Sequence, residues 1–172
     1  LRTITVIGAG VAGRNAIDAS INLGAKVNVI DLDEEKLKTL KQKYPTNLEG
    51  YLSNDSNITK CISESDLIIG SVYLTGKKAP TIITRSMLEQ IKPGTVLVDI
   101  SIDQGGCFET SKPTTHQDPT FLIDDILHYC VSNMPGAVPL TASESLNSAS
   151  LSYVQKLANN DLNLLLNEQD FK

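Results

Sequence analysis

Three glycines and one aspartate near the amino end of the chain have the types and spacing that bind a dinucleotide. Gly8, Gly10 and Gly13 form a G-x-G-x-x-G motif between the short β-branched run TITVI and a stretch with helical periodicity. Such a motif needs one glycine for a tight turn, one for close approach of the backbone to a pyrophosphate and one for helix–strand packing. The start of the following helix adds unpaired N–H groups and a partial positive charge. Asp31 comes 18 residues after Gly13, about the spacing expected for the carboxylate that binds the ribose hydroxyls.

Asp31 also predicts which dinucleotide the chain prefers. A carboxylate accepts hydrogen bonds from both ribose hydroxyls but repels a 2′-phosphate, and the neighbouring acids Asp33, Glu34 and Glu35 add negative charge. We therefore expect NAD(H) rather than NADP(H). Lys36 leaves two alternatives open: a solvated helix lysine, or a side chain that lies over the adenine or counters a 2′-phosphate.

A further acid, Asp103, follows the buried stretch GTVLVDIS (94–101) within the segment DISIDQGGCFE (99–109). Ligands of open parallel sheets bind beyond the carboxyl ends of the strands, so we expect Asp103 to face the nicotinamide half of the cofactor. Gly105 and Gly106 let the backbone pass close to a ligand. The alternative is that Asp103 only hydrogen-bonds its own turn.

The elements that must position these residues alternate between strands and helices. Strands are expected at 3–8, 26–31, 49–52, 66–70, 94–101, 119–123 and 127–131. Helices are expected at 11–23, 33–44, 54–63 and 84–91, with a further helical pattern over 139–167 that breaks near Asn159. This alternation predicts the α/β class, as a Rossmann-type doubly wound parallel sheet with helices on both faces.

The composition is that of a globular protein and shows no sign of nucleic-acid or membrane binding. Of the 172 residues, 41% are apolar and 20% charged, and the net charge of −5 with no basic run argues against nucleic acid and anionic membranes. No apolar stretch approaches the ~18 residues that span a bilayer. The cysteines Cys61, Cys107 and Cys130 show no C-x-x-C spacing, so we expect small buried side chains in a reducing cytoplasm.

Several stretches of the sequence resemble one family. They are VIGAGVAGRNA, LIIGSVYLTGKKAP, IKPGTVLVDISIDQGGCFE, KPTTHQDPTF and HYCVSNMPGAVPLTAS, with IDQGG-x-FE and NMPGAVP as the specific parts. Together they resemble the NAD-binding domain of the alanine dehydrogenase/nicotinamide nucleotide transhydrogenase family, on its alanine dehydrogenase side, over nearly the whole chain. The resemblance implies that L-alanine, NAD⁺ and water are converted to pyruvate, ammonia and NADH. It also implies a two-domain subunit in a homohexamer.

The chain is then expected to be a single NAD-binding domain, 1–172, from a longer subunit, because Leu1 precedes a strand by only two residues. The helical tail at 139–172 is expected to pack toward the missing substrate domain. Family members carry the substrate arginine and lysine and the catalytic histidine in that other domain, so we expect no turnover by this chain alone. His116, in a polar loop, and His128, in an apolar strand, do not substitute for that histidine, and His128 is expected to be structural.

The resemblance also places site residues. It implies that Asp103 borders the active site and interacts with the catalytic histidine or the substrate, where a carboxylate stabilises a positive imidazole or imine and helps to orient the hydrolytic water. Further cofactor contacts, with core packing as the alternative for each apolar member, are Val11, Ser53, Val72, Tyr73, Ile100, Lys112, Val131, Asn133 and Met134. They complete a predicted cofactor site with Gly8, Gly10, Gly13, Asp31, Lys36 and Asp103.

One residue departs from the family pattern, and one pair of acids could suggest a metal site. Tyr73 stands where a small or aliphatic residue is expected, so its contact is expected through the backbone. Glu109 and Asp118 lack histidine or cysteine partners and make a poor metal site, so we predict no metal.

Two other functions compete with the first. The second candidate is the NAD(H)-binding domain of a proton-translocating transhydrogenase, which ranks lower because that branch tends to carry a glutamate and an altered segment where this chain has Asp103 and NMPGAVP. The third is a nucleotide-sensing module without catalysis.

Overall fold

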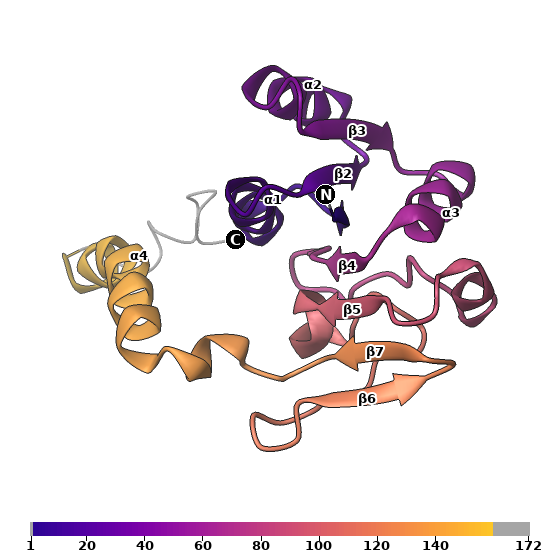
Figure 1. The fold of residues 1–172 in the computed structure, drawn as a ribbon. Helices are drawn as coiled ribbons and strands as arrows, with labels where there is room; N and C mark the ends of the chain where they lie inside the picture. Colours follow the sequence, from indigo (N-terminus) through magenta and orange to yellow (C-terminus); the bar gives the residue numbers. More distant parts are fainter. Residues whose placement is uncertain (1, 160–172) are drawn as a thin grey trace. The chain divides into compact units, whose positions relative to one another are not determined.

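The computed structural model describes residues 2–159 and divides the chain into two compact units, which meet in sequence between Ser132 and Asn133. The first unit is built on a seven-stranded sheet in the order β3-β2-β1-β4-β5-β7-β6 (Figure 1). Its strands are β1 (Thr3–Ile7), β2 (Lys26–Asp31), β3 (Leu48–Leu52), β4 (Leu67–Gly70), β5 (Val96–Asp99), β6 (Thr120–Ile123) and β7 (Ile126–Tyr129). All neighbouring pairs except β6 and β7 are parallel.

The helices cover both faces of this sheet. They are α1 (Val11–Asn22), α2 (Glu34–Lys43) and α3 (Asp55–Glu64), together with 3₁₀ helices at Arg85–Gln90 and Ile100–Gln104. α1 and α2 bury Ile17, Leu37 and Leu40 against one face, while α3 and the first 3₁₀ helix pack Ile62 and Leu88 against the other. Figure 1 shows α1 and α3 on opposite sides of the strands. The predicted doubly wound Rossmann-type fold is confirmed.

Local signals explain where two of the helices begin. The Asp33 carboxylate accepts hydrogen bonds from the backbone N–H groups of Glu35 and Lys36 at the start of α2, and the Asn54 side chain accepts one from Asn57 at the start of α3. These caps satisfy N–H groups that have no partner within the helix. They fix the point at which the chain leaves β2 and β3, and therefore where those strands present their ends.

The strand β6 corrects the expectation of an all-parallel sheet. β6 runs antiparallel to β7, with Phe121 opposite His128, because Asp124 and Asp125 form a two-residue turn with φ values of 52° and 60°. Two left-handed residues give the backbone twist that a tight hairpin needs, and aspartate tolerates that conformation better than most side chains.

The type of one predicted helix and the end of one predicted strand also differ from the predictions. The segment predicted as a helix at 84–91 is a 3₁₀ helix of six residues, since it is held by i→i+3 bonds such as Ile91 N–H to Leu88 O at 2.9 Å. The strand predicted to reach residue 101 ends at Asp99, whose carboxylate accepts a hydrogen bond from the Ser101 N–H and starts the 3₁₀ helix Ile100–Gln104.

The second unit contains a 3₁₀ helix, Met134–Ala137, and α4, Pro139–Asn159. α4 begins at Pro139, the residue where the helical pattern was predicted to begin, and it is described up to Asn159, the last described residue. The predicted break near Asn159 lies at the edge of the described residues and stays a prediction. The predicted continuation over 160–167 lies outside the described residues. The expectation that this tail packs on a further domain stays a prediction.

The three cysteines are buried and unpaired, as expected. Burial raises the pKa of the Cys61 thiol to about 11, which keeps it protonated and unreactive at neutral pH. Within residues 2–159, no helix has the length and apolar character needed to cross a membrane.

His128 is a structural side chain, as predicted. It is fully buried on β7, where its Nε2 lies 2.8 Å from the Thr110 hydroxyl and its Nδ1 lies 3.0 Å from the Ile126 carbonyl oxygen. Its ring stacks on Phe121 at 4.9 Å between centroids. Both ring nitrogens are therefore satisfied inside the fold.

Burial also makes His128 sensitive to acid. Loss of hydration lowers its pKa below the ordinary 6.5, so the unfolded chain takes up a proton below that pH while the folded chain does not. The free energy of unfolding should fall by up to about 1.4 kcal/mol per pH unit below pH ~6.5 from this residue. Urea unfolding of the wild type and His128→Gln between pH 5 and 8 measures the difference. Equal slopes for the two proteins would contradict the assignment.

Candidate functional site

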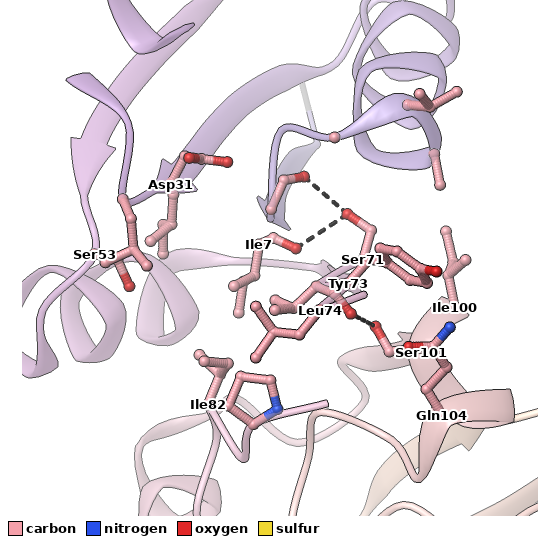
Figure 2. Close-up of a pocket in the computed structure, with 18 of the residues that line it drawn as sticks. Ile7, Asp31, Ser53, Ser71, Tyr73, Leu74, Ile82, Ile100, Ser101 and Gln104 are labelled. Carbon is pink, nitrogen blue, oxygen red and sulfur yellow. Dashed lines mark hydrogen bonds between the residues drawn. The ribbon is translucent and has the colours of Figure 1, made fainter. Parts of the chain in front are cut away.

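A cleft of about 810 Å³ opens where β1, β2, β3, β4 and β5 end. This is the edge at which open α/β sheets bind ligands, and the cleft straddles the point where the strand order reverses between β1 and β4. Figure 2 shows Asp31 and Ser53 on one side of Ser71, and Ile100, Ser101 and Gln104 on the other. The cleft therefore runs past the ends of five neighbouring strands of the sheet. The predicted residues that line it are Gly8, Gly10, Val11, Asp31, Lys36, Ser53, Val72, Tyr73, Ile100 and Asp103.

The three glycines of the loop have separable roles in this structure. A Cβ on Gly8, at φ +96°, would lie 2.7 Å from the Ser71 carbonyl oxygen, and a Cβ on Gly13 would lie 1.9 Å from the Gly8 carbonyl oxygen. Gly8 and Gly13 are thus required by the turn and by the packing of α1 on β1. A Cβ on Gly10 would meet nothing within 4 Å.

Gly10 is therefore a glycine that the fold itself does not demand. Its φ of −72° is accessible to any residue, and it lines the cleft at the start of α1. Val11, the first helical residue, is 82% exposed. Because no side chain fills the space in front of this helix start, a ligand can approach the backbone closely. The unpaired N–H groups there favour an anion.

Asp31, at the end of β2, lies beside the loop. Its Oδ2 accepts a hydrogen bond of 2.6 Å from the Ala9 N–H, and its Oδ1 accepts one of 2.9 Å from the Asp33 N–H. The ammonium of Lys36 lies 3.9 Å from Asp31 and 3.6 Å from Asp33, with the Asp31 side chain 12% exposed. Lys36 is therefore paired with both carboxylates. The lone pairs of Asp31 that these N–H groups leave unused face the cleft, where they can accept hydrogen bonds from hydroxyl groups.

The other end of the cleft is formed by the 3₁₀ helix Ile100–Gln104. The Ser101 hydroxyl donates to the Val72 carbonyl oxygen at 2.8 Å and ties this helix to the segment after β4. Asp103 lies on the same helix, lines the cleft and is exposed. Asp103 lies beyond the end of β5, and the expectation that it faces the nicotinamide half of a cofactor stays a prediction.

A buried acid that the sequence analysis overlooked holds this end in place. Asp99 is fully buried and accepts hydrogen bonds from the Ser101 N–H at 3.0 Å, the Cys107 N–H at 2.9 Å and the Ser111 hydroxyl at 2.5 Å. These hydrogen bonds hold the IDQGG turn against the Asp99 carboxylate. An acid as the last residue of an otherwise apolar strand was the signal, since a buried carboxylate must be fully hydrogen-bonded.

Five predicted cofactor contacts do not line the cleft. Gly13 is buried within α1, where it packs on the Gly8 carbonyl, Lys112 is exposed elsewhere, and Val131 is buried. Asn133 and Met134 belong to the second unit. Roles for Lys112, Val131, Asn133 and Met134 stay predictions.

Several residues that line the cleft were not predicted. They are Ile7, Ala12, Ile30, Leu32, Asp33, Ser71, Leu74, Pro80, Ile82, Ser101 and Gln104. Eight of these eleven directly precede or follow a predicted contact along the chain, and Asp33, Pro80 and Ile82 do not. Among residues 2–159, no group of three or more histidine, cysteine or acidic side chains is placed to hold a metal ion.

Comparisons with known proteins agree with this geometry. The family described as "Alanine dehydrogenase/PNT, C-terminal domain" matches residues 2–172. The alanine dehydrogenase of Halomonas elongata is 48% identical over 167 residues, which are 97% of this chain and 45% of the relative. That of Mycolicibacterium smegmatis is 46% identical over 155 residues, 90% of this chain and 42% of the relative. The chain thus spans about half the length of the curated relatives it matches.

Solved structures give the same picture. An L-alanine dehydrogenase superposes with a TM-score of 0.85 at 42% identity, covering 94% of this chain and 45% of that one. A transhydrogenase from Sinorhizobium meliloti superposes with a TM-score of 0.80 at 24% identity, covering 91% of this chain and 44% of that one. The second similarity shows a shared fold.

The glycine geometry predicts opposite outcomes for two matched substitutions. Gly10→Ala should leave the free energy of unfolding within about 1 kcal/mol of wild type but weaken dinucleotide binding at least roughly tenfold, because the methyl group enters the space in front of the helix start. Gly13→Ala should lower the free energy of unfolding by about 1–3 kcal/mol, because its methyl group collides with backbone. Urea unfolding and calorimetry on the same preparations separate the two. A Gly10→Ala protein with wild-type affinity would contradict the assignment of the cleft.

Proposed function

Because the chain belongs to the alanine dehydrogenase/PNT C-terminal domain family, we propose that it is the NAD(H)-binding domain of an alanine dehydrogenase. The observation that carries the proposal is Gly10, which has no steric reason to be glycine in the folded chain and lies at a helix start facing a cleft. The domains of this family are NAD-binding and the relatives of the chain are NAD-dependent.

The residues of the cleft fit NAD bound with its adenosine half beside β2 and β3 and its nicotinamide half beside β4 and β5. Asp31 and Ser53 would bind the adenosine half, since the Asp31 carboxylate accepts hydrogen bonds from ribose hydroxyls. The loop Gly8–Gly13 and the start of α1 would hold the pyrophosphate. Val72, Tyr73, Ile100 and Asp103 would then border the nicotinamide half. When bound, NAD supplies the acceptor for a hydride from the substrate.

Asp103 is the candidate for chemistry on this chain. It is exposed at the cleft, on a helix fixed from behind by Asp99 and by the bond from Ser101 to Val72. A carboxylate held there would stabilise positive charge that develops on a neighbouring imidazole or on the substrate's nitrogen, and would orient the water that attacks the carbon. The reaction would convert L-alanine, NAD⁺ and water into pyruvate, ammonia and NADH.

The rest of the enzyme follows from the relatives. They are about twice as long as this chain, and the additional length would carry the substrate-binding residues and the catalytic histidine. We expect this chain to bind the dinucleotide and not to turn over alone. A homohexamer in the cytoplasm is the expected state of the full-length protein.

Substitution of Asp103 tests the catalytic role. In the full-length protein, Asp103→Asn should lower kcat for alanine-dependent NADH formation by roughly a hundredfold while the Kd for NAD changes less than about twofold. The control is Asp118→Asn, an exposed acid that does not line the cleft, and it should keep wild-type turnover. Wild-type turnover by Asp103→Asn would remove Asp103 from the mechanism, and absence of alanine-dependent NADH formation by the wild type would refute the proposed enzyme.

Cofactor preference tests the role of Asp31. A 2′-phosphate placed against the carboxylates of Asp31 and Asp33 meets like charge, and Lys36 is already paired with both. We expect calorimetry to give a Kd for NADH about a hundredfold lower than for NADPH. The difference should shrink in Asp31→Asn. Equal affinities for the two dinucleotides in the wild type would contradict the assigned position of the adenosine ribose.

A further inference from the structure

Ser71 contacts the glycine loop from the end of β4. It follows β4 directly, is buried apart from 8% of its surface, and lines the cleft between its two ends (Figure 2). Its N–H donates to the Ile7 carbonyl oxygen at 2.8 Å. Its hydroxyl lies 2.8 Å from the Gly8 carbonyl oxygen and 3.0 Å from that of Ile7. A hydroxyl has one hydrogen to donate, and the shorter contact is to Gly8.

The Gly8 carbonyl belongs to the same peptide unit as the Ala9 N–H. That N–H donates to the Asp31 carboxylate at 2.6 Å. The peptide unit is therefore held at both ends, by a hydroxyl from β4 on its oxygen and by a carboxylate from β2 on its nitrogen. Glycine crosses between backbone conformations at little cost, so Gly8 by itself provides no resistance to rotation of this unit.

The orientation of this peptide unit decides which groups the loop presents to an anion. The Gly8 carbonyl oxygen lies against α1, where a Cβ on Gly13 would be only 1.9 Å away. With the oxygen held there, the N–H groups at the start of α1 face the cleft. If the unit rotated, a carbonyl oxygen would point toward the cleft and would repel a phosphate oxygen.

We infer that Ser71 is a positioning residue for the pyrophosphate, acting with Asp31 as a two-sided clamp on the Gly8–Ala9 peptide. This inference rests on the proposed function for the identity of the ligand, and on the hydrogen bonds above for the clamp itself. It makes Asp31 serve both parts of the dinucleotide, since the same carboxylate fixes the phosphate loop and binds the ribose. Ser71 should consequently affect the pyrophosphate and not the adenosine.

The test compares ligands with and without a pyrophosphate. In Ser71→Ala, Kd for NAD and for ADP-ribose should each rise about fivefold, the effect of one neutral hydrogen bond. The Kd for adenosine, measured by NMR titration, should change less than about twofold. Amide hydrogen exchange of Ala9 should also accelerate about fivefold, because the peptide unit has lost one of its two restraints.

Ser65→Ala is the matched control. Ser65 is a fully buried serine just before the start of β4. Its hydroxyl donates to the Cys61 carbonyl oxygen at 2.8 Å and lies 2.7 Å from the Thr5 hydroxyl. Ser65→Ala should lower stability through these lost bonds and leave NAD affinity and Ala9 exchange at wild-type values.

The outcomes separate the inference from the proposed function. Equal loss of affinity for NAD and adenosine, or an unchanged Kd for NAD and unchanged Ala9 exchange in Ser71→Ala, would overturn the clamp while NAD binding by the wild type still stands. A wild-type chain that binds neither NAD nor ADP-ribose would overturn the proposed function, and with it the ligand assigned to the clamp.

Discussion

The hydrogen bond from the Ala9 N–H to the Asp31 carboxylate is the contact on which the site depends. It joins the end of β2 to the glycine loop after β1, so the acid proposed to bind the ribose also holds the loop proposed to bind the phosphates. The same carboxylate accepts a second hydrogen bond from the Asp33 N–H, and the Lys36 ammonium lies 3.9 Å from it. Replacing this acid would therefore disturb two parts of the ligand site at once.

The fold could be predicted from the sequence because its main signals are local. β-branched runs ending at glycine and helices with capping acids define the strand–helix alternation, and Gly8, Gly10, Gly13 and Asp31 mark the strand ends that bind a dinucleotide. The antiparallel β6 was missed because its signal, two left-handed aspartates, depends on backbone conformation that composition does not specify. The 3₁₀ helix at 85–90 was missed because i→i+3 and i→i+4 bonding have the same short-range pattern.

Site residues were predicted where a short motif or the end of a predicted strand marks them in the sequence. Asp99 was overlooked although an acid ends its apolar strand, because its partners Cys107 and Ser111 lie in the turn that follows. Ser71 was missed because its partner Gly8 lies 63 residues earlier in the chain. Asp99 supports the cleft from its buried side, and Ser71 lines it. The family resemblance, which is confirmed by the comparisons, predicted contacts to a ligand and did not predict these two supporting residues.

We propose that backbone N–H groups at the start of α1 bind a pyrophosphate, and an NMR titration of this chain with NAD reports on those groups individually. We expect saturable shifts of the Gly10, Val11 and Ala12 amide resonances, with the Lys92 and Gly94 amides at the opposite end of the sheet unmoved. Saturation of NAD binding without any shift at those three amides, or shifts centred on the opposite end, would contradict it.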